Sequence, residues 1–177
     1  MSKTTWKLDP THSELGFKVK HMMMTNVSGS FGQFNVEANT EGDNFDKPEV
    51  HFTAQTASVN TGNEQRDGHL RSADFFDAEQ FPELKFDSTK MEKVDGENYK
   101  LHGDLTIKGV TKPVTLNAEF GGIGKDPWGN TKAGFTVSGK INRKDFGLNW
   151  NAALEAGGVL VSDEVKLQSE IQLVKAG

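Results

Sequence analysis

The sequence predicts an all-β fold, an antiparallel barrel with a short helical insertion, and three observations lead to this prediction. Apolar and polar residues alternate along most of the chain, glycine-containing turn signals separate the alternating segments, and only residues 63–76 break the pattern substantially. A period of two residues is typical of a strand with one buried face. Because 177 residues is close to the size of one large domain, we expect a single domain over residues 1–177.

The clearest alternation places Leu101, Leu105 and Ile107 on one face of a strand and Lys100 and Lys108 on the other. Similar patterns recur from the N-terminus to the C-terminus, so each of these segments is expected to bury one face. The predicted strands cover about residues 4–9, 13–21, 27–39, 49–58, 83–94, 98–109, 112–123, 131–142 and 163–175.

Short turn signals separate these strands, at Asp95-Gly96, Lys108-Gly109, Gly121-Gly122 and Gly157-Gly158. Such pairs favour hairpins over helical crossovers, which predicts mainly antiparallel, sequential pairing. An open sandwich is the alternative architecture. The long strands favour the up-and-down barrel, because closure leaves no exposed sheet edge.

Residues 63–76 are expected to form a short helix and a turn that cover one end of the barrel. This insertion brings Leu70, Phe75 and Phe76 to that end as a lid or plug. Its charged residues include Arg66, Asp67, His69 and Arg71. We expect Asp67 to cap the helix or to pair with a neighbouring arginine, and so to fix the insertion in place.

Composition excludes several classes of function. The formal net charge of −5 is far from the basic balance that phosphate binding favours, so no nucleic-acid partner is expected. No run approaches the roughly 18 apolar residues of a membrane helix. The chain lacks cysteine, which excludes disulfides and thiolate chemistry. Without an apparent signal peptide, the sequence as written predicts a cytoplasmic protein, or a periplasmic one if it is a processed form.

The five histidines show no spacing typical of a metal site, so no metal is expected. No nucleophile lies beside a recognisable base, and no catalytic residue is assigned. Glycines within the predicted strands, such as Gly29, Gly103 and Gly139, are expected either to relieve curvature or to widen the interior.

The aromatic content, twelve Phe and one Tyr, favours an apolar interior. A small barrel is either filled by its side chains or able to hold one slim ligand. From the shared alternation we predict a ligand tunnel, with the insertion residues Leu70, Phe75 and Phe76 near one end. The inward-facing residues expected to line it are Phe17, Val19, Phe31, Val36, Phe52, Phe86, Leu105, Ile107, Phe120, Phe135, Val137 and Ile141.

Several motifs, in order along the whole chain, resemble those of the YceI-like family of bacterial lipid-binding proteins. They are Trp6-Lys-Leu-Asp-Pro-Thr-His-Ser13, Phe17-x-Val-x-His21, Val27-x-Gly-x-Phe31, Arg66-Asp-x-His-Leu-Arg-Ser-x-Asp-Phe-Phe76, Phe81-Pro-x-Leu-x-Phe86, Gly103-Asp-Leu-Thr-Ile-x-Gly-Val-Thr-Lys-Pro-Val114 and Ile141-Asn-Arg-x-Asp-Phe-Gly147.

This resemblance implies a lipocalin-like eight-stranded antiparallel barrel whose lumen holds a polyisoprenoid, an isoprenoid quinone or another long-chain amphiphile. It implies no enzymatic activity and no cofactor other than such a bound lipid. The alternative function is a hydrolase or stress-response enzyme that uses His12, Asp67 and His69. A third interpretation is a lumen filled by side chains. The sequence leaves open transient contact with a membrane and the formation of a homodimer.

Overall fold

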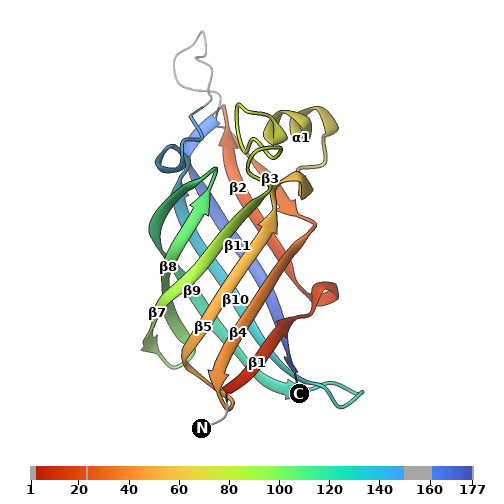
Figure 1. Ribbon diagram of the computed structural model, residues 1–177, viewed down its shortest axis with the longest axis vertical. Coiled ribbons are helices and arrows are strands. Elements are labelled where there is room, and N and C mark those ends of the chain that lie inside the picture. Colours follow the sequence, from red (N-terminus) through yellow and green to blue (C-terminus); the bar gives the residue numbers. More distant parts are fainter. Residues whose placement is uncertain (1–2, 23, 150–160, 177) are drawn as a thin grey trace.

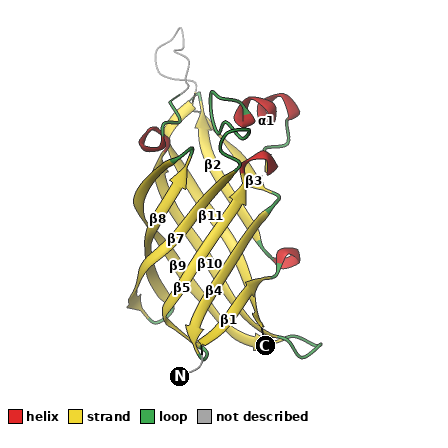
Figure 2. Cartoon of the chain, viewed as in Figure 1, coloured by secondary structure: helices red, strands yellow, loops and turns green. Residues whose placement is uncertain are grey.

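The computed structural model describes residues 3–22, 24–149 and 161–176, which form one β-barrel (Figure 1). Strands make up its wall, and the helices lie at its end and sides (Figure 2). No helix in these described ranges has the length and hydropathy needed to cross a bilayer.

The strands are β1 (Lys3–Leu8), β2 (Glu14–His21), β3 (Thr25–Phe31), β4 (Phe34–Glu41), β5 (Asn44–Gln55), β6 (Val59–Asn60), β7 (Glu83–Asp95), β8 (Asn98–Ile107), β9 (Val110–Lys125), β10 (Thr131–Asn142) and β11 (Val161–Ala176). The helices are α1 (Glu64–Arg71) and three 3-10 turns, η1 (Pro10–His12), η2 (Thr56–Ser58) and η3 (Arg143–Phe146).

The eleven strand segments form eight barrel strands, because β1 and β2, β3 and β4, and β5 and β6 are consecutive parts of three interrupted strands. Every pairing is antiparallel. Each joins barrel strands that follow one another in the chain, apart from the closure, in which the last strand, β11, pairs with β1 and β2 of the first. There Thr5 pairs with Ala176 and Leu8 with Leu173. The prediction of a closed, eight-stranded antiparallel barrel is therefore confirmed.

Several details of the predicted strands and turns are wrong. The strand expected over about 49–58 ends at Gln55, and residues 56–58 form η2. The segment expected as one strand over 27–39 is interrupted between β3 and β4. Gly121-Gly122 is not a hairpin turn: β9 continues to Lys125, and the register with β10 shifts at this point, as in a β-bulge. Gly122 has φ +107°, which a glycine adopts without strain.

Of the other three expected turns, two lie in the described residues and both are hairpin turns. Asp95 pairs with Asn98 across a tight hairpin, as predicted. Lys108 and Gly109 both have positive φ, 52° and 75°, between β8 and β9. This pair of left-handed residues is typical of the hairpin turns that match strand twist. The expected turn at Gly157-Gly158 lies outside the described residues.

The end of the barrel nearer the two termini is closed by packed rings. Trp6 is fully buried, and its Nε1 donates a hydrogen bond to Oγ1 of Thr40 at 2.9 Å. The Phe45 ring lies 5.0 Å from that of Trp6 and 5.1 Å from that of Phe135. Rings from several strands thus converge and fill the interior at this end.

The insertion begins with α1, at the opposite end from the termini (Figure 1). Asn63, not Asp67, is its N-cap, with a side chain that accepts a hydrogen bond from the backbone N–H of Arg66 at 3.0 Å. Asp67 is buried and accepts hydrogen bonds from the backbone N–H and the hydroxyl of Thr61, at 2.9 and 2.6 Å. It therefore fastens α1 to the preceding segment through a threonine, where we expected a cap or an arginine partner.

Candidate functional site

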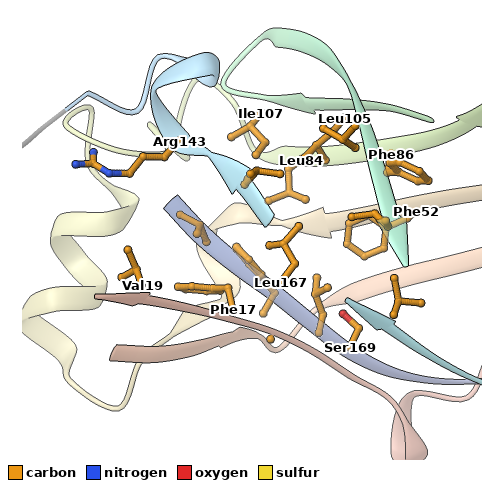
Figure 3. A pocket seen from close by; sticks show the side chains of 18 of the residues that line it. Phe17, Val19, Phe52, Leu84, Phe86, Leu105, Ile107, Arg143, Leu167 and Ser169 are labelled. Carbon is orange, nitrogen blue, oxygen red and sulfur yellow. The ribbon is translucent and has the colours of Figure 1, made fainter. Parts of the chain in front are cut away.

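The barrel encloses an elongated cavity of about 590 Å³, lined almost entirely by apolar side chains (Figure 3). Side chains from many strands point into this space, among them Phe17, Phe52 and Leu167. The volume lies within the range of about 300–1,000 Å³ found for small-molecule sites. The prediction of an unfilled apolar interior thus corresponds to a real cavity, called here the lumen.

Fourteen of the fifteen residues predicted to bind ligand line the lumen: Phe17, Val19, Phe31, Val36, Phe52, Leu70, Phe75, Phe76, Phe86, Leu105, Ile107, Phe135, Val137 and Ile141. The insertion contributes three of them. The Phe76 ring packs 5.7 Å from that of Phe31, which joins the insertion to the barrel wall. That these side chains contact a ligand stays a prediction.

Phe120 is the exception, since it does not line the lumen. Its ring lies 5.6 Å from that of Phe45 and 5.1 Å from that of Phe135. Phe120 follows the inward alternation of β9, but it falls in the ring cluster that closes the barrel. Alternation identifies the inward face and does not show how far along the barrel axis the interior is filled.

Sequence reasoning left out many other lining residues, among them Leu15, Leu84, Met91, Leu101, Leu116, Val165, Leu167, Ile171 and Leu173. Most of them follow the same alternation as the predicted residues. Arg143 is a further omission, and no periodic pattern identifies it because it lies in η3 rather than in a strand.

Three strand glycines leave room for neighbouring side chains. A Cβ atom at Gly29 would collide with the Phe17 ring, and one at Gly103 with the Phe86 ring. At Gly139 it would come within 2.7 Å of the Leu116 side chain. The space over these glycines is therefore occupied by side chains that themselves line the lumen, so here the glycines do not widen it.

The lumen reaches solvent at the end covered by α1. Its lining there includes the exposed residues Lys20, His21, Gln65 and Arg66. Nε of Arg66 donates a hydrogen bond to Oγ1 of Thr61 at 2.7 Å, which orients the guanidinium at the opening. Among the described lining residues no Asp or Glu occurs, so the charged side chains that line this opening, called here the mouth, are cationic.

Arg143 lies at the same end and is only 3% exposed. Its guanidinium donates hydrogen bonds to backbone carbonyls, including those of Ser162 at 2.9 Å and Leu148 at 2.5 Å. Burial lowers the pKa of the guanidinium, whereas nearby Asp163 raises it. These bonds fix the segment after β10 against the start of β11, and so shape the mouth.

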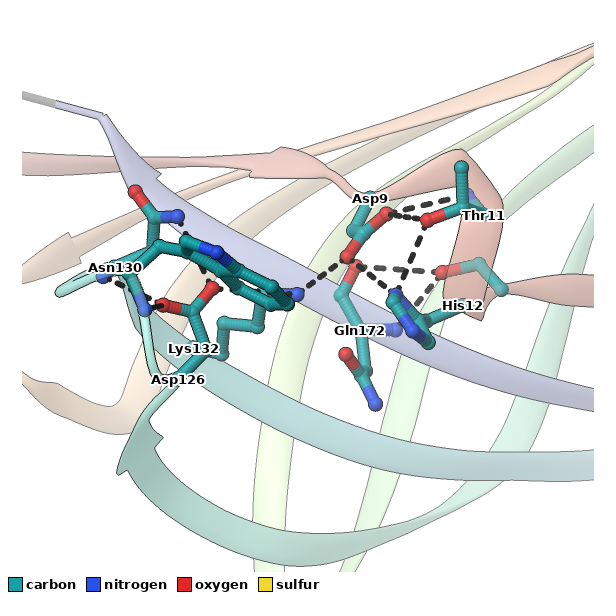
Figure 4. Close-up of polar contacts among 9 residues, drawn as sticks. Asp9, Thr11, His12, Asp126, Asn130, Lys132 and Gln172 are labelled. Carbon is teal, nitrogen blue, oxygen red and sulfur yellow. Dashed lines mark hydrogen bonds and ion pairs between the residues drawn. The ribbon is translucent and has the colours of Figure 1, made fainter.

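A polar cluster lies outside the barrel near the closed end (Figure 4). Nζ of Lys132 lies 2.6 Å from Asp9 and 3.8 Å from Asp126, and all three side chains are largely shielded from solvent. The hydrogen bond from Lys132, followed by those from His12 and Thr11, lowers the pKa of the Asp9 carboxyl well below its usual range. The cluster joins η1 to the β9–β10 loop.

Residues 6–173 match the model of the YceI-like domain. The chain belongs to the YceI-like family. Among curated relatives, a UPF0312 protein of Staphylococcus aureus (strain N315) is 40% identical over 170 residues, which cover 96% of each chain. Bacterial relatives thus match this YceI-like protein over nearly its whole length.

Solved structures agree with this membership. The Campylobacter jejuni YCEI protein is 36% identical, has a TM-score of 0.77, and covers 96% of this chain and 97% of its own. Burkholderia cenocepacia BcnA has a TM-score of 0.81 at 22% identity, and covers 93% and 98%. A polyisoprenoid binding domain from Saccharophagus degradans has a TM-score of 0.67 at 16% identity, and covers 97% and 98%. At such low identity, the last two likenesses show the fold alone.

This YceI-like barrel does not bring together the three residues of the alternative enzyme. His12 lies in η1 on the side of the barrel, whereas Asp67 and His69 lie on α1 at one end (Figure 1). His12 contacts Asp9 at 2.8 Å, and His69 contacts Asp74 at 2.9 Å. The names of the relatives above state no enzymatic reaction.

The described part of this YceI-like chain has no group of three or more His, Asp or Glu side chains placed to hold a metal ion. Four of its five histidines instead each contact one carboxylate. His51 contacts Asp87 at 2.8 Å, and His102 contacts Glu92 at 2.6 Å. The chemistry that the site offers is burial of apolar surface, with the cationic groups at the mouth and the Ser169 hydroxyl as a polar group on the lumen wall.

Proposed function

We propose that this protein binds a long-chain amphiphile, such as a polyisoprenoid or an isoprenoid quinone, with the tail in the lumen and the head at the mouth. The observation that carries the proposal is an apolar cavity of about 590 Å³ that reaches solvent beside polar and cationic side chains. The polyisoprenoid-binding domain from Saccharophagus degradans, which has the same fold, adds support.

The energy of binding comes from burial of the tail. Each buried methylene contributes roughly 0.8 kcal/mol, so a tail of about fifteen carbons is held firmly without a hydrogen bond along its length. The affinity is expected to rise with tail length until the lumen is full. Lys20, His21 and Arg66 then interact with the head, and select among ligands that share a tail.

A charge placed inside the lumen tests the proposal. Val137 lines the lumen from β10, and Val137→Asp would bury a carboxylate among apolar side chains. Because an unpaired buried charge costs several kcal/mol, affinity for farnesol and for longer isoprenoid alcohols is expected to fall at least about tenfold. Ile107→Glu on β8 should act in the same way.

The matched control is Ser138→Asp, which adds the same charge at the next residue of β10, where the side chain does not line the lumen. It should bind as the unchanged protein does. Mass spectrometry of an organic extract of the purified protein would identify a lipid retained through purification. Equal binding by the Val137 and Ser138 variants, both correctly folded, would contradict the proposal.

A further inference from the structure

The barrel wall is interrupted between its first two strands. β1 pairs with β4 as far as Lys7 and Glu37, and β2 pairs with β3 from Gly16 and Ser30 onward. Between these two points no backbone pairing joins residues 8–15 to residues 31–36, all of which the structure describes. In this gap η1 projects from the side of the barrel (Figure 2).

Both edges of the gap are fastened to the strands behind them. On one edge, the backbone N–H of Asp9 donates to the carbonyl of Gln172 at 2.9 Å, and the Ser13 hydroxyl accepts from the N–H of Gln172. On the other edge, the N–H of Gly32 donates to the carbonyl of Ser58 at 3.0 Å. Hydrogen bonds therefore hold both edges of the gap in place, so the gap is an ordered part of the barrel wall.

A second pocket, of about 440 Å³, lies in this gap. Its lining residues include Glu14, Leu15, Phe31, Gly32 and Gln33. Leu15 and Phe31 line both this side pocket and the lumen, so these two side chains border both spaces. Leu15 is only partly buried, and a change of its rotamer needs no movement of the backbone.

The side pocket differs from the mouth in charge. Lys20 and Arg66 line the mouth, whereas the charged residue of the side pocket is Glu14. A carboxylate beside the gap disfavours an anionic head there and leaves an apolar tail unaffected. The polarity of the two openings therefore favours one orientation, with the head at the mouth and the tail end at the gap.

We propose that the gap is a side portal, through which the far end of a tail longer than the lumen leaves the barrel, with Leu15 as its gate beside the packed ring of Phe31. This inference rests on the proposed function. The lumen accommodates a short isoprenoid tail by itself, and the side pocket adds room for the end of a long one. A barrel of fixed length thereby binds tails of different lengths.

Gly32 allows the portal to be filled without strain. A Cβ atom there would meet only the Ser58 carbonyl oxygen, at an ordinary contact distance of 3.8 Å. Gly32→Leu should therefore fold normally and place an apolar side chain in the side pocket. Gly124→Leu is the matched control, because a Cβ at that exposed glycine of β9 meets nothing within 4 Å and the residue lines neither pocket.

The experiment measures the affinities of farnesol, whose tail is short, and of solanesol, whose tail is long, for these variants. Gly32→Leu is expected to weaken solanesol binding at least about tenfold and to leave farnesol binding unchanged, while Gly124→Leu changes neither. Equal solanesol affinity in both variants would overturn the portal. Loss of both ligands by Gly32→Leu would also count against it, because the change would then act on the lumen. If the unchanged protein bound neither alcohol, the proposed function would fail as well.

A second measurement locates the tail end directly. The chain has no cysteine, so Gln33→Cys provides a single thiol in the side pocket for a bimane label. A long tail with a nitroxide at its far end should quench this label, and a short tail with the same nitroxide should not. The same label on the Val94→Cys variant, at an exposed position near the end of β7, should remain unquenched by both. Absence of quenching in the labelled Gln33→Cys variant with the long tail bound would overturn the portal.

Discussion

The two halves of the barrel interior differ in how completely they are filled. At the closed end, the ring of Phe45 packs within about 5–6 Å of the rings of Trp6, Phe120 and Phe135. Toward α1, aliphatic side chains such as Leu167 face the lumen and are only partly buried. The same inward alternation thus produces a packed core at one end and a cavity at the other, so the two ends should respond differently to mutation.

The largest expected effect is that of Trp6→Ala at the closed end. Trp6 is fully buried and its Nε1 is bonded to Thr40, so the change leaves both a cavity and a hydroxyl that has lost its donor. We expect the free energy of unfolding to fall by about 3–5 kcal/mol. Urea denaturation of the lipid-free protein measures it.

The contrasting change is Leu167→Ala in the lumen, where a cavity is already present. Its expected cost is about 2 kcal/mol or less, at the low end for a leucine, because few contacts are removed. It should also admit a bulkier tail. If Leu167→Ala destabilised the lipid-free protein as much as Trp6→Ala, the distinction between a filled and an unfilled end would be wrong.

An effect smaller than that of Trp6→Ala is also expected at the insertion that borders the mouth. Asp67→Asn weakens two hydrogen bonds from Thr61 to a buried carboxylate and should destabilise the insertion by about 1–3 kcal/mol. A lower melting temperature and faster amide hydrogen exchange across residues 61–71 would show this. Loss of an activity with unchanged stability would instead assign Asp67 a chemical role.

The polar cluster near the closed end gives the protein a defined pH dependence. Because the pKa of Asp9 is lowered on folding, its contribution to stability is complete above the unfolded value of 3.8 and is lost as the pH falls below it. Lys132→Met removes the ion pair, so it should lower the free energy of unfolding slightly at neutral pH and raise the pKa of Asp9 toward its usual value.

The stability of Lys132→Met should consequently fall less steeply below about pH 4 than that of the unchanged protein. Urea unfolding at several acidic pH values, together with NMR titration of the Asp9 carboxyl, tests this. An unchanged pKa of Asp9 in the variant would show that His12 and Thr11 alone are responsible for lowering it.

The smallest effect is expected at Trp128, the exposed counterpart of Trp6. Trp128 is 81% exposed on the β9–β10 loop, whose backbone is held by hydrogen bonds to the Asp126 side chain. Trp128→Ala should therefore change the free energy of unfolding by no more than about 0.5 kcal/mol. A larger loss of stability would show that the indole packs against the loop in solution.

Most of the fold follows from local sequence, because a period of two residues and glycine-containing turns act over short distances. The alternation around Leu105 and Val137 identified both strands and their inward faces. The same rule identified fourteen lining residues and could have identified Leu167 and Ile171 as well. Arg143 could not be identified in this way, because its burial depends on carbonyl groups of β11 and of residue 148.

The sequence by itself determined a closed antiparallel barrel with one apolar inward face, since each strand carries that information in its own residues. Only the tertiary structure decided where the interior is filled, as the position of Phe120 among the closing rings shows. It also decided where the wall opens, because the gap beside Leu15 depends on how far two strands pair before they separate. Strand pairing and the packing of the interior depend on residues that are distant in the chain, so the alternation within one strand does not predict them.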